Sequence, residues 1–257
     1  MANVNSTPEQ INYVTEDECV PGNAIRDTFG KPVRTVDGSF VLLGEEQLDP
    51  GPRAAKDQGL TIARQIPKNF LVSIDNPNPP GGVGRLNTLY TKAVMTVLGQ
   101  ASSGLSYNLI GASDFVGKYQ IDASTLADLG YIKTEYVSVY SRASVKKDIA
   151  WTGKDGITSL LSWFNSPGVQ EKTMYQLLQQ NYNIMLNNGA ITSADNLCTI
   201  AGMLCVAHIL GPGTGTEKSP GAKRWRETGG GQDINGNFAA YYFALGRYAV
   251  DVLAART

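Results

Sequence analysis

A helix, a polar loop and a Gly-x-Tyr-Gln turn follow one another in residues 86–130, and this order constrains the fold more than any other feature of the sequence. Over residues 86–101, apolar residues recur with the 3.6-residue spacing of an amphipathic helix. A loop rich in Ser, Gly and Asn leads from there to residues 117–120, GKYQ. Asp122 can cap a short helix, and Gly130 can end it in a left-handed conformation. The stretch therefore predicts two helices joined through a tight turn.

Helical patterns continue to the end of the chain. Three longer helices are predicted, over residues 166–189, over residues 197–211 and from residue 236 on; Pro167 stands at the first position of the first of them. No alternating strand pattern and no internal repeat follows Arg85. Residues 85–257 are therefore predicted to form a mainly α domain of five to seven helices with long polar connections.

Residues 1–84 have a different pattern. Pairs such as Pro-Gly, Asp-Gly and Asn-Pro recur at short intervals and mark turns. Between them lie short apolar runs at residues 39–43 and 70–74, which could be strands, and a possible helix at residues 54–65 that contains Gly59. We expect an extended, irregular arm that lies on the following domain or on a partner subunit. A flexible tail is the alternative, but it would expose these apolar runs.

Composition excludes several classes of function. The chain has 257 residues, 42% of them hydrophobic, and a formal net charge of -1, so the overall charge does not favour nucleic acid. No apolar run is long enough to predict a transmembrane helix. The first residues lack the basic and apolar regions of a signal peptide. The sequence favours one large domain, or one domain with an extension.

The three cysteines, Cys19, Cys198 and Cys205, suggest neither a disulfide pattern nor a metal site. Cys198 and Cys205 would lie about 10 Å apart along a helix, too far to bond to each other. With a single His in the chain, the usual Cys/His zinc spacings are absent. We expect buried thiols from a reducing compartment, and no cofactor.

Several segments resemble a known family. Residues 115–121 (FVGKYQI) and 125–131 (TLADLGY) resemble the Gly-x-Tyr-Gln segment of the lysozyme-like transglycosylase superfamily, and a phage-borne branch of it in particular. Further segments similar to that branch follow in the same order: 151–157 (WTGKDGI), 165–171 (NSPGVQE), 202–213 (GMLCVAHILGPG) and 223–236 (KRWRETGGGQDING). The resemblance covers about residues 85–257 and implies a lysozyme-like helical domain behind the N-terminal arm.

Members of such families cleave the β-1,4 bond between the aminosugars of peptidoglycan. The resemblance implies that a Glu in an apolar pocket closes the first helix and protonates the leaving oxygen. The matching position here is Gln100, to within one or two residues, and residues 76–113 contain no Asp or Glu. A Gln side chain can bind a sugar but cannot act as a general acid. The sequence therefore favours a domain without catalysis, while a Glu→Gln change introduced by design stays open.

Other carboxylates could replace the acid. Asp114 precedes the Gly-x-Tyr-Gln turn, where some glycosidases place a second carboxylate, and it is the one serious substitute. Asp122 is interpreted as a helix cap. Glu171, in the resembling segment 165–171, is expected to make a buried structural hydrogen bond rather than to act on a substrate.

The resemblance also implies substrate contacts. Tyr119 would offer a stacking face and Gln120 hydrogen bonds to N-acetyl groups, with Ser103 and Asn108 as further contacts. An equally good interpretation is that Tyr119 and Gln120 hold the turn against the helix. His208 lies on the apolar face of its helix and is expected to be a core histidine with its hydrogen bonds satisfied.

These observations lead to a functional hypothesis with two alternatives. The protein would be a structural component of a phage virion, in the tail or baseplate, assembled in the host cytoplasm. Residues 1–84 would bind other tail or baseplate subunits, and residues 85–257 would contact peptidoglycan strands without cleaving them. The first alternative is an active virion-associated muralytic enzyme that uses Asp114. The second is a free sugar-binding module. Neither nucleic acid nor a membrane is expected as a partner.

Overall fold

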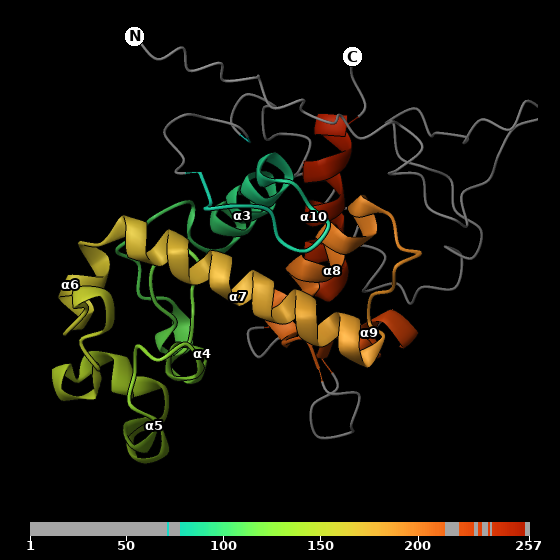
Figure 1. The fold of residues 1–257 in the computed structure, drawn as a ribbon. Helices are drawn as coiled ribbons and strands as arrows, with labels where there is room; N and C mark the ends of the chain where they lie inside the picture. Colours follow the sequence, from blue (N-terminus) through green and yellow to red (C-terminus); the bar gives the residue numbers. More distant parts are fainter. Residues whose placement is uncertain are drawn as a thin grey trace, which may run out of the picture.

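The computed structural model describes residues 71, 78–213, 221–228, 231–232, 236 and 238–254. In these residues the protein is mainly α-helical, as predicted, and contains isolated β-bridges but no strand (Figure 1). The α-helices are α3 (Thr88–Ser103), α4 (Ala123–Asp128), α5 (Thr134–Tyr140), α6 (Leu160–Phe164), α7 (Pro167–Asn188), α8 (Leu197–Leu210), α9 (Gly221–Thr228) and α10 (Ala239–Ala254). Short 3-10 turns lie between α3 and α6: η3 (Ala112–Asp114), η4 (Ser141–Lys146), η5 (Asp148–Ala150) and η6 (Lys154–Gly156).

The described part of the chain thus has eight α-helices, more than the five to seven predicted. The additional helices include α5 and α6, which have 7 and 5 residues. Helices of that length complete at most two turns, so their apolar residues cannot show a periodic pattern.

Helix α7 crosses the molecule and connects two groups of helices (Figure 1). Helices α4, α5 and α6 lie along its N-terminal half, and α8, α9 and α10 lie toward its C-terminal end. Helix α8 is apolar around its circumference and forms the centre of the core together with α10. The two backbones approach closely at Gly246, where a Cβ atom would stand 2.4 Å from the carbonyl oxygen of Ala201.

The helix ends follow the sequence signals. The side chain of Asp122 accepts a hydrogen bond from the backbone N–H of Thr125 at 2.7 Å, which confirms the predicted cap. Gly130 has a φ of 80°, the left-handed conformation expected after α4. Pro167 begins α7 as predicted, although the side chain of Ser166 makes no capping hydrogen bond.

The predicted domain boundary after residue 84 is not a break in packing. Val83 is fully buried in the core, and its backbone N–H donates to Thr91 Oγ1 at 3.0 Å. Lys92 Nζ on α3 donates to Asn78 Oδ1 at 2.9 Å. The end of the predicted arm therefore lies on the helical domain. Leu71, inside the run predicted as a strand at residues 70–74, is helical and buried.

The remaining predictions for the arm, at residues 39–43 and 54–65, lie outside the described residues.

One expectation about the cysteines is corrected by the structure. Cys205 is a buried free thiol, as predicted, but Cys198 is disulfide-bonded. The argument from helix spacing excluded only a bond between these two cysteines. Every helix in the described ranges is too short or too polar to cross a bilayer.

Candidate functional site

The Gly-x-Tyr-Gln turn is held by a pair of backbone hydrogen bonds. Val116 and Ile121 exchange both bonds at 3.1 Å, and residues 117–120 form the loop between them. Gly117 has a φ of 78°, and a Cβ atom there would stand 2.3 Å from Gln170 Oε1. Only glycine fits this close approach between the turn and α7.

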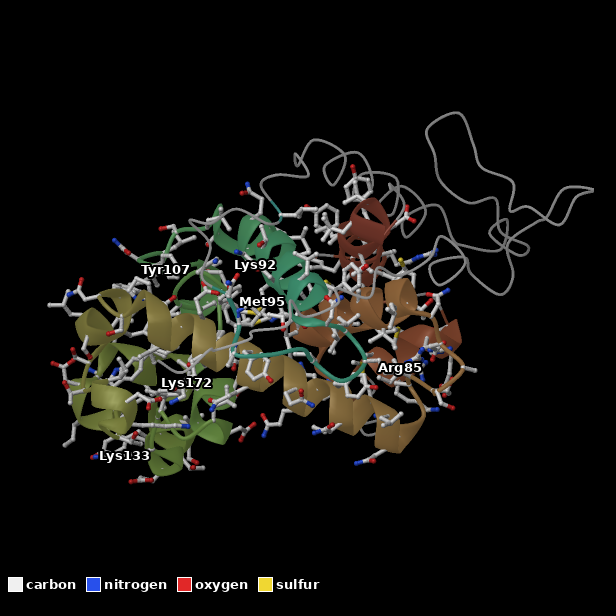
Figure 2. The ribbon with its side chains drawn as sticks, turned by 45° about the horizontal axis from the view of Figure 1, so that its top comes forward. Arg85, Lys92, Met95, Tyr107, Lys133 and Lys172 are labelled. Carbon is white, nitrogen blue, oxygen red and sulfur yellow. The ribbon has the colours of Figure 1, made fainter. Side chains whose placement is uncertain are left out.

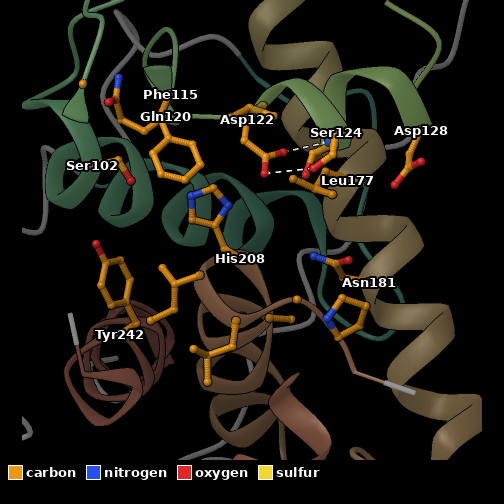
Figure 3. Close-up of a pocket in the computed structure, with 18 of the residues that line it drawn as sticks. Ser102, Phe115, Gln120, Asp122, Ser124, Asp128, Leu177, Asn181, His208 and Tyr242 are labelled. Carbon is orange, nitrogen blue, oxygen red and sulfur yellow. Dashed lines mark hydrogen bonds between the residues drawn. The ribbon is translucent and has the colours of Figure 1, made fainter. Parts of the chain in front are cut away.

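A cavity of about 1020 Å³ opens beside this turn (Figure 3). Typical small-molecule sites occupy about 300–1,000 Å³, so the cavity has room for a ligand larger than one sugar ring. Its walls come from the end of α3, the loop before the turn, α4, η4, α7, the end of α8 and α10: Ala101, Ser102, Leu109, Gly111, Ala112, Phe115, Gln120, Ile121, Asp122, Ser124, Thr125, Asp128, Arg142, Leu177, Gln180, Asn181, Ile184, Ala207, His208, Ile209, Leu210, Gly211, Pro212 and Tyr242.

The other side of the turn faces a buried ionic network. Lys118 Nζ pairs with Glu171 Oε1 at 2.7 Å, and both side chains are almost fully buried. Tyr119 donates its hydroxyl hydrogen to Glu171 Oε2 at 2.6 Å, and Tyr107 donates to Oε1 at 2.7 Å. The positive charge of Lys92, on α3, also interacts with the carboxylate of Glu171; Lys92 and Tyr107 are labelled in Figure 2. Glu171 therefore fixes the turn to α7, as its predicted structural role requires.

Burial dominates the electrostatics of this network. Loss of contact with water raises the pKa of Tyr107 and that of Tyr119, and the hydrogen bonds to Glu171 raise both further. Burial lowers the pKa of Lys118, although the carboxylate of Glu171 opposes the shift. The tyrosines thus stay protonated donors across the physiological range, which is the state a structural network needs.

His208 stands inside the cavity near Phe115 (Figure 3). Burial lowers its pKa to about 4, against weaker opposing effects of the Tyr119 backbone and the charge of Asp122. Its Nδ1 atom is buried and has no hydrogen-bond partner among the described residues. This corrects the expectation of a core histidine with all its hydrogen bonds satisfied: His208 is a neutral side chain on the cavity wall, and its Nδ1 is enclosed by protein atoms.

At the end of α3, Gln100 and Ser102 lie on different sides of the helix, both within the range predicted for the missing acid. Gln100 is exposed and does not line the cavity, whereas Ser102 does. Two residues correspond to about 200° of rotation around a helix, so the two side chains point in nearly opposite directions. Ser102 is four residues after the buried Leu98 and shares its face. That spacing was the available signal, and it identifies Ser102 as the position next to the cavity.

The other predicted substrate contacts separate into two groups. Gln120 lines the cavity, and its Nε2 donates to the carbonyl of Gly117 at 2.8 Å, so it both holds the turn and faces the cavity. Tyr119 is buried in the core instead. Ser103 Oγ donates to the Lys118 carbonyl at 2.7 Å and, like the exposed Asn108, does not line the cavity. Tyr119, Ser103 and Asn108 therefore lie away from this cavity, and their implied roles as substrate contacts stay predictions.

Asp114 does not line the cavity either. Its carboxylate forms an ion pair with Lys146, and its backbone has a φ of 61°. The carboxylates on the cavity wall belong to α4. Asp122 accepts the capping hydrogen bond from Thr125 and another from Ser124 Oγ at 3.0 Å, while Asp128 is exposed. A role for Asp114 as a substitute acid would therefore have to be exercised outside this cavity, and it stays a prediction.

Sequence reasoning did not identify Asn181 or Asp128 as cavity residues. Asn181 appeared only as part of the apolar-periodic face of its helix, and Asp128 only within the resembling segment. Among the described residues, no three His, Cys, Asp or Glu side chains converge as metal ligands. The cavity wall offers hydrogen-bonding groups and charges from side chains such as Gln120, Asp128 and Asn181.

Comparison with protein-family models, curated protein sequences and solved structures returns no match for the chain. The fold and the cavity define the class of protein by themselves. It is a mainly α-helical protein in which a polar cavity lies between the end of α3, a Gly-x-Tyr-Gln turn, α4, α7 and α8.

Proposed function

We propose that the protein contacts peptidoglycan through a lysozyme-like domain that does not cleave it, and that it serves as a structural component of a phage tail or baseplate. The proposal rests on the resemblance of residues 85–257 to phage-borne lysozyme-like proteins. A cavity next to the segment that carries the resemblance supports it. Helix α3 and the turn form part of the cavity wall, with Ser102 and Gln120 facing it.

One observation supports the catalytic part of the proposal: Ser102, within two residues of the predicted acid position Gln100, lines the cavity at the end of α3. A serine hydroxyl does not donate its proton near neutral pH in the way a carboxylic acid does. Glycosidase acids are carboxyl groups held in apolar surroundings. Asp122 is engaged as a helix cap and Asp128 is exposed to solvent, so neither matches that environment.

The virion part of the proposal depends on the resemblance. Residues 1–84 would attach the protein to other tail or baseplate subunits. The particle would be assembled in the host cytoplasm and would deliver the domain to the cell wall. Detection of the chain in purified particles by mass spectrometry tests this part.

The release of soluble muropeptides from purified peptidoglycan tests the catalytic part. We expect the native chain to release none, because general acid catalysis contributes about 10²–10⁴-fold to such reactions. Ser102→Glu is expected to release muropeptides, since it places a carboxyl group at the cavity wall. Gln100→Glu is the matched control on the same helix end, where the side chain is exposed to solvent, and it should remain inactive.

Two results would change the proposal. Release by the native chain that Asp114→Asn or Asp128→Asn abolishes would replace it with an active muralytic enzyme. Equal activity of Gln100→Glu and Ser102→Glu would mean that the cavity is not where the glycan is cleaved.

A further inference from the structure

The cysteines of the chain leave one candidate for the disulfide partner of Cys198. The sequence contains three cysteines, Cys19, Cys198 and Cys205. Cys198 is disulfide-bonded, and Cys205 is a buried free thiol. Within one chain, a bond from Cys198 is therefore left with Cys19 as its other end. A bond between Cys198 and a second copy of the chain is the alternative, and it would produce a covalent dimer.

Cys198 lies in the first turn of α8, directly after the loop that joins α7 to α8. The side chain of Asn196 caps this helix and accepts a hydrogen bond from the backbone N–H of Thr199 at 2.8 Å. The side chain of Cys198 is fully buried between these capping contacts and the core. A capped first turn is held in place by its own hydrogen bonds, so a segment bonded to Cys198 is fixed at a defined point of the domain.

The end of the N-terminal arm reaches the same loop. Arg85 Nη1 donates to the backbone carbonyl of Ser193 at 3.0 Å and to that of Asp195 at 2.6 Å. Asp195 precedes Cys198 by only three residues. Its carboxylate pairs with Arg226 Nη2 at 2.6 Å, which holds the loop to α9. Arg85, labelled in Figure 2, therefore joins the arm to the start of α8.

The residues just before Arg85 are fixed to the domain by contacts of their own. Leu71 and Val83 are fully buried in the core. The backbone N–H of Gly84 donates to Gln179 Oε1 on α7 at 3.4 Å, and the carbonyl of Gly82 accepts from the hydroxyl of Tyr175 at 3.4 Å. The C-terminal end of the arm is thus anchored independently of any disulfide.

We propose that Cys19 is the disulfide partner of Cys198, and that the bond closes residues 20–84 into a loop with both ends at the start of α8. Cys198 is already oxidised, so the proposal assigns its partner and adds no redox step. Partner subunits would then meet a closed loop instead of a free arm. This last consequence alone rests on the proposed function, and the position of the disulfide does not.

The length of the loop does not oppose its closure. The entropy cost of closing a flexible loop grows only slowly with the number of residues in it. The contacts of Leu71, Val83 and Arg85 also shorten the part that remains to be ordered. In the unfolded chain the same bond removes conformational freedom, which stabilises the folded state.

Peptide mapping of the full chain under non-reducing conditions tests the pairing. Trypsin cleaves after Lys and Arg, so Cys19 falls in the peptide 1–26 and Cys198 in the peptide 173–218, which also contains Cys205. We expect these two peptides to be joined, and fragmentation of the joined peptide to place the bond at Cys198. The same joined mass in Cys205→Ala excludes Cys205 as the bonded residue.

Thiol counts in denaturant without reductant provide a second readout. The native chain should show one reactive thiol, Cys19→Ser two, and Cys205→Ala none. Cys19→Ser should also unfold about 5–15 °C below the native chain, because the bond no longer restricts the unfolded state. A reductant should lower the unfolding temperature of the native chain to that of Cys19→Ser and leave Cys19→Ser unchanged.

Three results would overturn the closed loop. A covalent dimer on a non-reducing gel would place the bond between two copies of the chain. Three reactive thiols in the native chain would mean that no bond forms. A single reactive thiol in Cys19→Ser would show that Cys198 is still bonded without Cys19. None of these results bears on the cavity or on peptidoglycan contact, so the proposed function is tested separately.

Discussion

The two halves of α7 carry buried polar side chains in opposite states of hydrogen bonding. In the N-terminal half, Gln170 accepts from the Lys118 backbone at 2.9 Å and donates to the carbonyls of Tyr107 and Trp163 at 3.0 and 2.9 Å. Toward the C-terminal end, the side chain of Asn181 lines the cavity, and its amide makes no hydrogen bond to another described residue. The same chemical group is structural at one position and available at the other. Its partners decide its role, since buried polar groups in folded proteins are normally satisfied.

The Gly-x-Tyr-Gln turn shows the same contrast over two consecutive residues. Tyr119 is buried against Glu171, and Gln120 faces the cavity. The turn therefore joins a satisfied network to an open site, and a rigid network positions one wall of that site. Rigid surroundings are what a binding site needs, because ordering the site on binding would reduce affinity.

The largest change in the free energy of unfolding is expected in the hydrogen-bonded network at the N-terminal half of α7. Glu171→Gln should lower the free energy of unfolding by about 3–5 kcal/mol, because Lys118 would be buried without its counter-charge. Urea unfolding followed by circular dichroism measures the change. Glu227→Gln is the control: its pair with Lys223 spans 3.4 Å on the surface of α9, and its loss should cost less than about 0.5 kcal/mol. Equal losses in the two variants would contradict the structural role of the network.

The next effect concerns His208 and pH. Burial lowers its pKa to about 4 in the folded protein, compared with an ordinary value of 6.5 in the unfolded chain. Between these values the unfolded chain binds a proton that the folded protein does not, so stability falls as the pH drops from about 6.5 to 4. At about 1.4 kcal/mol per pKa unit the loss is at most about 3 kcal/mol, and less where water in the cavity reaches the ring.

His208→Gln provides the comparison. The difference in unfolding free energy between native protein and variant should shrink by that amount from pH 7 to pH 4. Carboxylates that titrate in the same range are common to both proteins and cancel in the difference. If the free energies of unfolding of the two proteins changed with pH in parallel, His208 would be as well hydrated as a histidine on the surface, and the prediction would be wrong.

Local signals in the sequence predicted the elements near the site better than the site itself. The cap at Asp122, the glycine after α4 and Pro167 at the start of α7 were all predictable, because each depends on neighbours within a few residues. The structural role of Glu171 was also expected, although its partners were not. Lys118 and Tyr119 lie more than fifty residues away in sequence, and only the fold brings them to Glu171.

The cavity wall was predicted less well for the same reason. Whether Gln100 or Ser102 faces the cavity depends on how α3 is rotated relative to the turn. Two positions along a helix point in nearly opposite directions, so the sequence alone does not distinguish them. The open state of Asn181 depends on which groups are missing around it. No local pattern encodes an absent partner, so the apolar periodicity of α7 indicated a core position.

The smallest change in the free energy of unfolding is expected at Asn181, where α7 lines the cavity. Asn181→Leu is expected to change the free energy of unfolding by no more than about 1 kcal/mol, because it removes an amide that has no partner and keeps a similar volume. Gln170→Leu, on the same helix, is the matched control and should lower it by at least about 2–4 kcal/mol. That change leaves the Lys118 amide and the carbonyls of Tyr107 and Trp163 without their partner.

Urea unfolding of the two variants side by side tests the contrast directly. Equal destabilisation would mean that ordered water satisfies Asn181 in the folded protein, and the α7 end of the cavity would then be a hydrated structural space. An unchanged free energy of unfolding in Asn181→Leu has the opposite meaning. The amide would then contribute nothing to the stability of the fold, and its position at the cavity wall would be explained by the ligand that it binds.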